Sequence, residues 1–378
     1  MSRFFTRERF GSAQFIASVI LFAFLLQCLW FCSRVPLADR ELAFILQGQQ
    51  QWRLVAGSAH AQVSPVTGLL AALPLLASHA TEERVPPYWR WLARAPFMVV
   101  GLLFGASIWY VARRLYGNVA GYIALTLYSF SPWFVIHSAV VHPEVIAGWG
   151  GFGVVFTGIG VAHSLYAPRE VVLWNWKRIV LLGVALGVGC AAHAAVLLLV
   201  PVTLAFMWYL VPERRGAAAA ILLAGCAVGG AIAWAAYGFS IAALWHGIAG
   251  SHAFQMTPDS FSAPVTWSAL LTFFLRQQPT VTLLLFVSLV TFAAWKRARF
   301  FGTAAPLLVF GLLMLAGIGA SAQGALPFYL LALPFAFVFT AGVLTDLLES
   351  RYAPLSLGVV LGILVGHIVI GVGGLLRM

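Results

Sequence analysis

Charged side chains are scarce in this sequence: only 9% of its 378 residues are Asp, Glu, Lys or Arg, whereas roughly 25% is usual for a soluble domain. This shortage excludes a protein that folds with water as its main solvent. The uncharged residues form long apolar runs such as 14–33, 95–112 and 354–376. Each run can cross a hydrocarbon layer of ~30 Å as a helix. The sequence therefore predicts an all-α polytopic membrane protein with no large soluble domain.

Other signals are also missing. The four cysteines all lie in apolar runs, so they say nothing about the redox compartment. The sequence has no phosphate-binding glycine loop and no nucleophile elbow. No pair of residues has metal-ligand spacing. The formal charge of +11 comes from small basic groups between apolar runs, and not from one water-facing surface, so we predict no nucleic-acid partner. No small-residue cleavage site follows the first apolar run, which predicts an uncleaved anchor.

The hydrophobic pattern predicts about eleven transmembrane helices. They cover 14–33, 95–112, 118–136, 144–166, 179–193, 194–211, 216–239, 279–295, 303–321, 326–345 and 354–376. With the N-terminus inside, every short outer turn is free of Lys and Arg, so the positive-inside rule predicts N-terminus in and C-terminus out. The stretch 179–211 has basic pairs at both flanks. We expect two short helices meeting near His193, with a single long tilted span as the alternative.

Two long loops are expected on the outer side. The first, residues 34–94, is the most polar part of the chain and predicts an amphipathic surface helix around 38–50 and a short apolar helix at 66–77. The second loop, residues 240–278, predicts a surface helix at 267–275. We expect a module over 1–245, followed by 246–378 with the remaining helices. Function should therefore lie at the outer membrane face.

Three carboxylates are candidates for chemistry at this face. Asp39 and Glu41 follow the first span, and a carboxylate at the membrane boundary could act as general base toward an acceptor hydroxyl. The alternative is a solvated acidic face of a surface helix. Glu144 opens the fourth span, where an acidic residue also serves ordinary helix capping. Together with Asp39 or Glu41 it could orient an acceptor or bind a divalent cation, the single cofactor that the sequence suggests.

Cationic side chains in the outer loops are candidates for binding a lipid phosphate. Arg84, Arg94 and Arg276 can each offer bidentate hydrogen bonds to a phosphate. The alternative is snorkelling toward anionic head groups. His193 and His367 lie inside apolar runs, where an ionisable residue suggests function. A hydrogen bond to a neighbouring helix is the commoner explanation for such a histidine.

Several motifs occur in an order that resembles the C-type (GT-C) polyprenyl-phosphate-sugar-dependent glycosyltransferases. This group includes lipid A aminoarabinose transferases and protein O-mannosyltransferases. The likeness extends over most of residues 10–345. The motifs are Asp39-Arg-Glu-Leu-Ala-Phe44 after the first span, Leu92-Ala-Arg-Ala-Pro96 and Ala112-Arg-Arg-Leu-Tyr-Gly117 in the second, Ser129-Phe-Ser-Pro-Trp133 ending the third, an acidic residue opening the fourth, and Tyr329-Leu-Leu-Ala-Leu-Pro334 late in the chain.

The resemblance implies a glycosyltransferase of the cytoplasmic (inner) membrane whose active face is outward. It would be an inverting enzyme that moves a sugar from a polyprenyl-phosphate donor to an envelope lipid, glycan or protein acceptor. The family's catalytic base falls on Asp39 or Glu41, and its second acidic position falls on Glu144. His60 and His193 lie nearest to positions where the family has basic donor-binding residues.

Three departures from the family keep other functions open. The family's Lys-Pro-Pro or His-Pro-Pro is Val63-Ser-Pro-Val66 here, His193 replaces a lysine, and Phe328 replaces an arginine. Fewer cations would face a lipid phosphate, so a lipid flippase or transporter, or a catalytically inactive GT-C-like partner protein, remains an alternative. Ion-coupled transport is disfavoured because no span contains a charged residue except Glu144 at its boundary.

Overall fold

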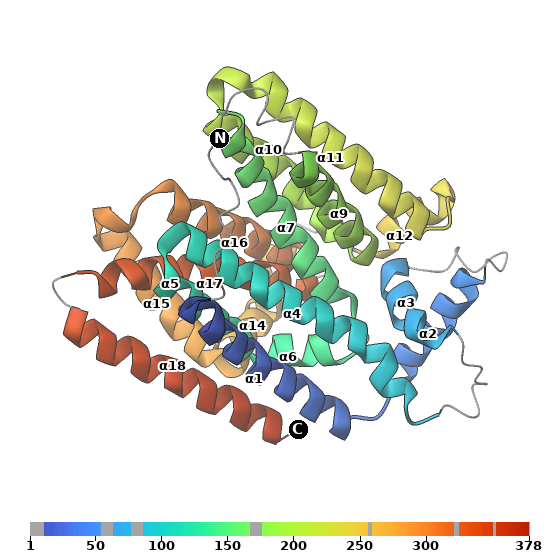
Figure 1. Cartoon of the computed structure of the whole chain (residues 1–378), viewed down its shortest axis with the longest axis horizontal. Helices are drawn as coiled ribbons and strands as arrows, with labels where there is room; N and C mark the ends of the chain where they lie inside the picture. Colours follow the sequence, from blue (N-terminus) through green and yellow to red (C-terminus); the bar gives the residue numbers. More distant parts are fainter. Residues whose placement is uncertain are drawn as a thin grey trace.

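The computed structural model describes residues 11–53, 63–76, 86–166, 176–255, 259–320, 325–350 and 353–377. These residues fold into helices joined mostly by short turns (Figure 1). The long apolar helices are α1 (Ser12–Arg34), α4 (Trp89–Tyr116), α7 (Pro143–Ser164), α11 (Arg215–Ala236), α16 (Phe301–Gly319), α17 (Ala325–Leu348) and α18 (Ala353–Leu376). The shorter ones are α2 (Asp39–Trp52), α3 (Pro65–Ala72), α5 (Asn118–Ser129), α6 (Pro132–Ala139), α9 (Trp176–Ala192), α10 (Leu199–Leu210), α12 (Ile241–Gly250), α13 (Asp259–Ser262), α14 (Pro264–Thr272) and α15 (Pro279–Ala294).

The multi-pass helical membrane architecture predicted from the sequence is confirmed. Within the described ranges, seven helices are long and apolar enough to cross a membrane, or up to nine if two sharply bent helix pairs each count as one span. The predicted number was about eleven. The difference arises largely at α9 and α10, which have only 17 and 12 residues, less than the roughly 20 residues that an upright span needs.

The chain breaks at His193, where two short helices were expected to meet. His193 is in an extended conformation between α9 and the 3₁₀ turn Ala194–Leu198, which leads into α10. Both α9 and α10 pack against α7. Two separate helices, and not one long tilted helix, therefore occupy this stretch.

Two helix pairs are sharply bent where a short break interrupts the apolar sequence. Helices α5 and α6 meet at 63° around Ser131 and Pro132, because a proline at the first helical position cannot continue the preceding helix. The segment Thr266–Gln277 meets α15 at 103° just before Pro279. The helix predicted at 267–275 is present as α14 and the π-helical turn η5 (Phe273–Gln277), which leads through Gln278 into α15.

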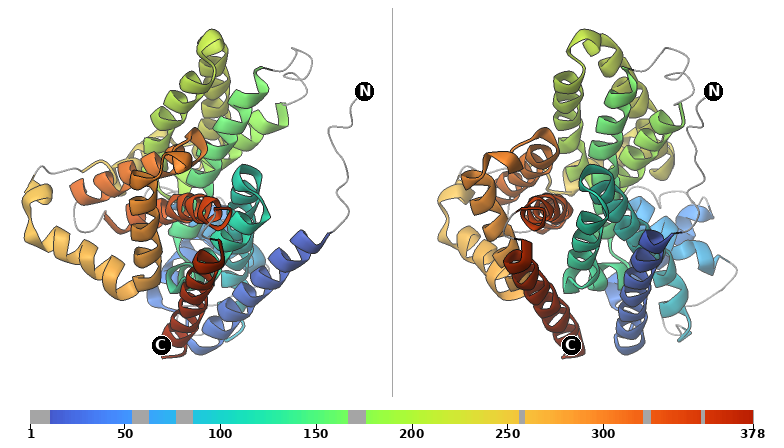
Figure 2. Two further views of the ribbon diagram at one scale, coloured as in Figure 1. Left: turned by 90° about the vertical axis from the view of Figure 1, so that its left-hand side faces the viewer. Right: turned by 60° about the vertical axis from the view of Figure 1, so that its left-hand side comes forward.

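The core of the molecule is α17, whose most apolar stretch is completely buried. It runs through the middle of the bundle; in Figure 1, α9 to α12 lie above it and α14 and α15 below it, and α16 packs against it on the side that faces α10. Figure 2 shows α1 and α18 at the periphery, and much of their apolar surface is exposed to the surroundings. An exposed apolar surface of this kind is what contact with lipid requires.

The long loop after α1 contains the two short helices that the sequence predicted. Helix α2 covers 39–52 and packs on α3. The two come so close that a Cβ added at Gly48 would lie 2.0 Å from the carbonyl oxygen of Gly68. Residue 245, the expected end of the first part of the chain, lies inside α12.

Candidate functional site

Glu41 and Arg94 form a buried ion pair that joins α2 to α4. Arg94 Nε donates to Glu41 Oε1 at 2.9 Å, and Arg94 Nη2 donates to Oε2 at 2.6 Å. The remaining guanidinium donors reach the carbonyl oxygens of Val35 and Pro36, both at 2.8 Å. Arg94 is completely buried. Its side chain therefore binds the α1–α2 connection and is not available to a lipid phosphate.

Two backbone amides complete the environment of Glu41. The Ala38 N–H donates to Oε2 at 3.0 Å, and the Val141 N–H donates to Oε1 at 2.8 Å. Burial raises the pKa of Glu41, but the hydrogen bonds from Arg94, Ala38 and Val141 outweigh this effect and hold the pKa below its usual value. Each carboxylate oxygen already accepts two hydrogen bonds, which is its full capacity. Glu41 therefore holds the start of α2 against the turn before α7.

Asp39 has the opposite environment. It is the first residue of α2, it is exposed, and within the described part of the chain its carboxylate has no ion pair or hydrogen bond. Asp39 and Glu41 are two residues apart at the start of α2. Because Glu41 accepts a hydrogen bond from the Val141 N–H, this end of α2 lies beside the turn Val141–His142. Of the two acidic residues in this motif, Asp39 has the carboxylate that is free to accept a proton.

Glu144 lies in a cluster with two histidines. His142 Nδ1 is in direct contact with Glu144 Oε2, and His137 Nδ1 lies 3.7 Å from the same oxygen. One ligand-type atom from each of the three residues lies within 4.8 Å of the other two. His137 and Glu144 are largely buried, while His142 is 22% exposed. The cluster forms because Pro143 begins α7 directly after His142 and turns the chain back toward α6.

The donor set of this cluster fits a divalent transition metal. Two imidazole nitrogens and one carboxylate oxygen suit Zn²⁺ and similar ions, whereas Mg²⁺ and Ca²⁺ prefer oxygen ligands only. His137 Nδ1 is buried without a hydrogen-bond partner, and an unpaired buried nitrogen costs free energy that a metal bond would recover. Among the described residues, this is the one group of three or more metal-type side chains that comes together.

His193 lies near the same cluster. Its Nδ1 accepts a hydrogen bond from the Ala195 N–H at 3.2 Å, so the proton of the neutral ring is on Nε2. It is 7% exposed and close enough to Glu144 for their charges to interact. Ser64, in the loop between α2 and α3, donates to the Ala192 carbonyl at 2.6 Å, which brings that loop next to His193.

Arg276 is a predicted phosphate-binding arginine, and its side chain is exposed. It lies in η5, next to Gln277, whose Oε1 accepts a hydrogen bond from Trp133 Nε1 at 3.0 Å. Trp133 in turn stacks on His137, with ring centroids 5.0 Å apart. The other two predicted donor-binding residues, Arg84 and His60, lie outside the described residues.

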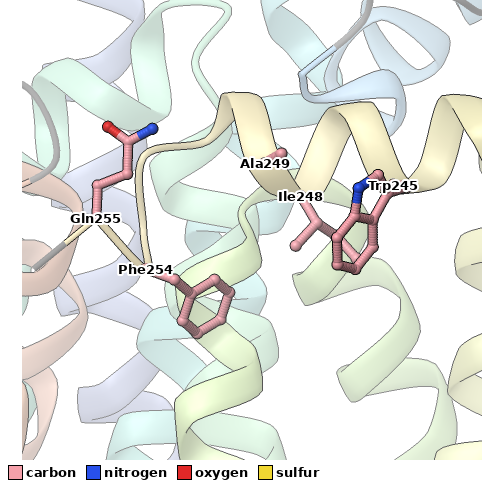
Figure 3. A pocket seen from close by; sticks show the side chains of 5 residues that line it. All are labelled: Trp245, Ile248, Ala249, Phe254 and Gln255. Atoms are coloured by element: carbon pink, nitrogen blue, oxygen red, sulfur yellow. The ribbon is translucent and has the colours of Figure 1, made fainter.

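Two further features lie apart from this cluster. His367 is bonded on both ring nitrogens, to Thr280 Oγ1 at 2.6 Å and to the Leu127 carbonyl at 3.1 Å, so it is an internal link between α18, α15 and α5. A small cavity of about 260 Å³ beside α12 is lined by Trp245, Ile248, Ala249, Phe254 and Gln255 (Figure 3). None of the candidate site residues lines it.

The sequence pattern missed His137 and His142 as members of the site. His142 is adjacent to the predicted Pro143-Glu144 helix start, so a His-x-Glu pair was visible in the sequence. His137 could not be connected with it, because only the break between α6 and α7 folds it back over Glu144. The possible pairing of Glu144 with Asp39 or Glu41 stays a prediction; the Val141 N–H, three residues before Glu144, donates a hydrogen bond to Glu41.

No known family model matches the sequence, and no curated protein matches it either. Solved structures do match the fold. The apo oligosaccharyltransferase of Archaeoglobus fulgidus superposes with a TM-score of 0.64 at 11% identity, covering 97% of this chain and 56% of that protein. Its complex with an inhibitory peptide and a dolichol-phosphate gives 0.60 at 12% identity, covering 95% and 56%. Its complex with Zn and sulfate gives 0.61 at 12% identity, covering 93% and 52%.

These matches establish the fold class. The chain has the fold of the archaeal oligosaccharyltransferase and spans a little over half the length of that protein. The resemblance to the GT-C group predicted from sequence motifs is confirmed at the level of fold. At 11–12% identity, no residue of the archaeal enzyme carries over by itself.

Proposed function

We propose that this protein is an inverting membrane glycosyltransferase that uses a polyprenyl-phosphate-linked sugar as donor. The observation that carries the proposal is the His137, His142 and Glu144 cluster, placed beside the start of α2 by the Glu41–Val141 hydrogen bond. A fold shared with an enzyme solved in complex with a dolichol-phosphate supports a lipid-linked donor. The acceptor would be an envelope lipid, glycan or protein.

In this proposal Asp39 is the general base. Its free carboxylate takes the proton of the acceptor hydroxyl as that oxygen attacks the anomeric carbon, and the bond from that carbon to the donor phosphate oxygen breaks with inversion. Arg276, an exposed cation, would contact the departing lipid phosphate. Glu41 and Arg94 take no direct part, because each satisfies the other.

His137, His142 and Glu144 would hold a divalent cation. When bound, such an ion stabilises the negative charge that develops on a phosphate leaving group. Without it, the cluster still orients His142 through its contact with Glu144. A fold neighbour solved with Zn and sulfate supports this assignment, as does the mixed nitrogen and oxygen donor set.

We also propose that the protein lies in the cytoplasmic (inner) membrane with this site at the outer face. The support is the distribution of basic residues between the spans. Single cysteines placed at Glu213 and at Asp39 in a variant without native cysteines would react with an impermeant thiol reagent only at position 39 in intact cells. Reaction at 213 and not at 39 would reverse the orientation.

The deciding experiment measures sugar release from a panel of radiolabelled polyprenyl-phosphate sugars by the protein in lipid nanodiscs. Asp39→Asn should reduce turnover about 100-fold or more, and Glu213→Gln, which changes an exposed acid in another loop, should leave it intact. Full turnover in Asp39→Asn would overturn the mechanism. Absence of turnover with every donor would favour the flippase or the inactive partner protein instead.

A further inference from the structure

The metal-type residue His137 has no hydrogen bond to orient it within the described part of the chain. Ligating histidines usually donate their second ring N–H to a carboxylate, carbonyl or water, which fixes the ring. For His137, contacts with two neighbouring aromatic rings restrict the imidazole instead of a hydrogen bond. Trp133 stacks on one face, with centroids 5.0 Å apart and an interplanar angle of 11°, and His142 approaches edge-on at 5.1 Å.

Trp133 is positioned for this contact by its own helix. Trp133 and His137 are four residues apart on α6, so their side chains lie on the same face one turn apart. A stacked indole restricts rotation of the imidazole about its second side-chain torsion, which is otherwise soft. The orientation of His137 therefore depends on where the indole lies.

The indole is in turn held by the segment before α15. Trp133 Nε1 donates to Gln277 Oε1 at 3.0 Å, and the Phe273 ring packs against the indole at 5.5 Å. The next residue, Gln278, is almost fully buried and accepts a hydrogen bond from Ser131 Oγ at 3.1 Å. The segment thus contacts α6 at two points, before and at Trp133.

The segment that makes these contacts is itself unusual. Residues 273–277 form a π-helical turn, a rare conformation that often marks functional positions. This turn also carries Arg276, the cation assigned above to the lipid phosphate. A change in the position of η5 would therefore move both the phosphate contact and the indole that faces His137.

We propose that Trp133 is a positioning residue for His137, and that Gln277 couples the place of the η5 turn to the metal cluster. This inference rests on the proposed metal site. It requires that removing the aromatic face weakens metal binding, although neither Trp133 nor Gln277 is itself a ligand. Removing only the indole hydrogen bond should have a smaller effect in the same direction.

The test titrates Co²⁺ into the purified full-length protein and records affinity and the visible absorption bands, which report ligand geometry. Trp133→Leu removes the ring, and Trp133→Phe keeps an aromatic face without the N–H. Gln277→Met removes the acceptor at similar length. Trp267→Phe is the matched control, because Trp267 Nε1 donates to the Phe261 carbonyl at 2.8 Å in the same outer loop.

Trp133→Leu should weaken Co²⁺ binding about 10-fold or more, as loss of a supporting contact typically does, and should shift the absorption bands. Trp133→Phe should recover most of the affinity, Gln277→Met should lose a few-fold, and Trp267→Phe should match wild type. Wild-type affinity and bands in Trp133→Leu would overturn the positioning role while leaving the metal site in place. Absence of Co²⁺ binding in the wild type, or wild-type binding in His142→Ala, would overturn the metal site and this inference together.

Discussion

Arg94 donates hydrogen bonds to both carboxylate oxygens of Glu41, at 2.9 and 2.6 Å, and both side chains are buried. Glu41, a candidate catalytic base, and Arg94, a candidate phosphate-binding residue, therefore form an ion pair with each other. Removing one partner of a buried pair leaves the other charge uncompensated, which commonly costs about 3–5 kcal/mol. The pair is therefore expected to act on stability first and on activity only through the fold.

Glu41→Gln should lower the free energy of unfolding by about 3 kcal/mol, measured by denaturant titration in detergent. Asp39→Asn is the matched control and should change it by less than about 0.5 kcal/mol, because Asp39 is exposed and unpaired. The pKa of Glu41 is lower in the folded chain, so its stabilisation is complete above the unfolded value of about 4.3 and is lost as pH falls through the folded value. Equal stability of Glu41→Gln and wild type at pH 7 would contradict this assignment.

Asp39→Asn should reduce kcat/KM for sugar transfer about 10²- to 10⁴-fold, which is the usual contribution of a general base. The amide cannot take the proton of the acceptor hydroxyl, but the substitution leaves the Glu41–Arg94 ion pair intact. Initial rates with a turnover-competent donor, together with unchanged thermal unfolding, separate this effect from misfolding. A loss of less than threefold would transfer the role of base to another residue.

Removal of the metal cluster should abolish tight Zn²⁺ binding. His142→Ala and Glu144→Gln should each weaken binding by at least about 100-fold, more than the loss typical of a supporting residue, in isothermal titration of chelator-treated protein. The control is His163→Ala, since His163 is an exposed histidine at the other end of α7. Unchanged Zn²⁺ affinity in His142→Ala would show that these three side chains do not bind metal.

Arg276→Gln should raise the KM for the polyprenyl-phosphate donor about 10-fold or more, because a hydrogen bond to a charged group contributes about 1.5–3 kcal/mol. The effect should weaken at high salt, since the arginine is exposed. Arg215→Gln, an exposed arginine at the start of α11, should leave KM unchanged. Equal KM values for the two variants would remove Arg276 from the donor site.

Gly187→Ala should destabilise the contact between α9 and α11 by about 1–3 kcal/mol. A Cβ at this position would lie 2.6 Å from the Gly229 carbonyl oxygen, so the helices would have to separate. Gly230→Ala in α11 is the control: its Cβ meets nothing within 4 Å, and alanine is the better helix former by about 0.5–1 kcal/mol. The free energy of unfolding, measured by denaturant titration, should therefore fall in Gly187→Ala and rise in Gly230→Ala. A stabilised Gly187→Ala would contradict the close packing.

The sequence by itself determined the membrane class, the helical architecture, the break at His193 and the two short helices between α1 and α4. These features follow from local properties: long apolar runs, prolines at helix starts and helical periodicity. The motifs also indicated the GT-C fold, because their order along the chain was preserved although each motif was short.

Only the tertiary structure decided what the candidate residues contact. It paired Glu41 with Arg94, left Asp39 free and folded His137 over Glu144. Whether a carboxylate is a base or half of an ion pair depends on which cation lies within 3 Å of it, and for Glu41 that cation is 53 residues away in the chain. Packing of α2, α4 and α6 sets that distance, and no local pattern in the sequence encodes it.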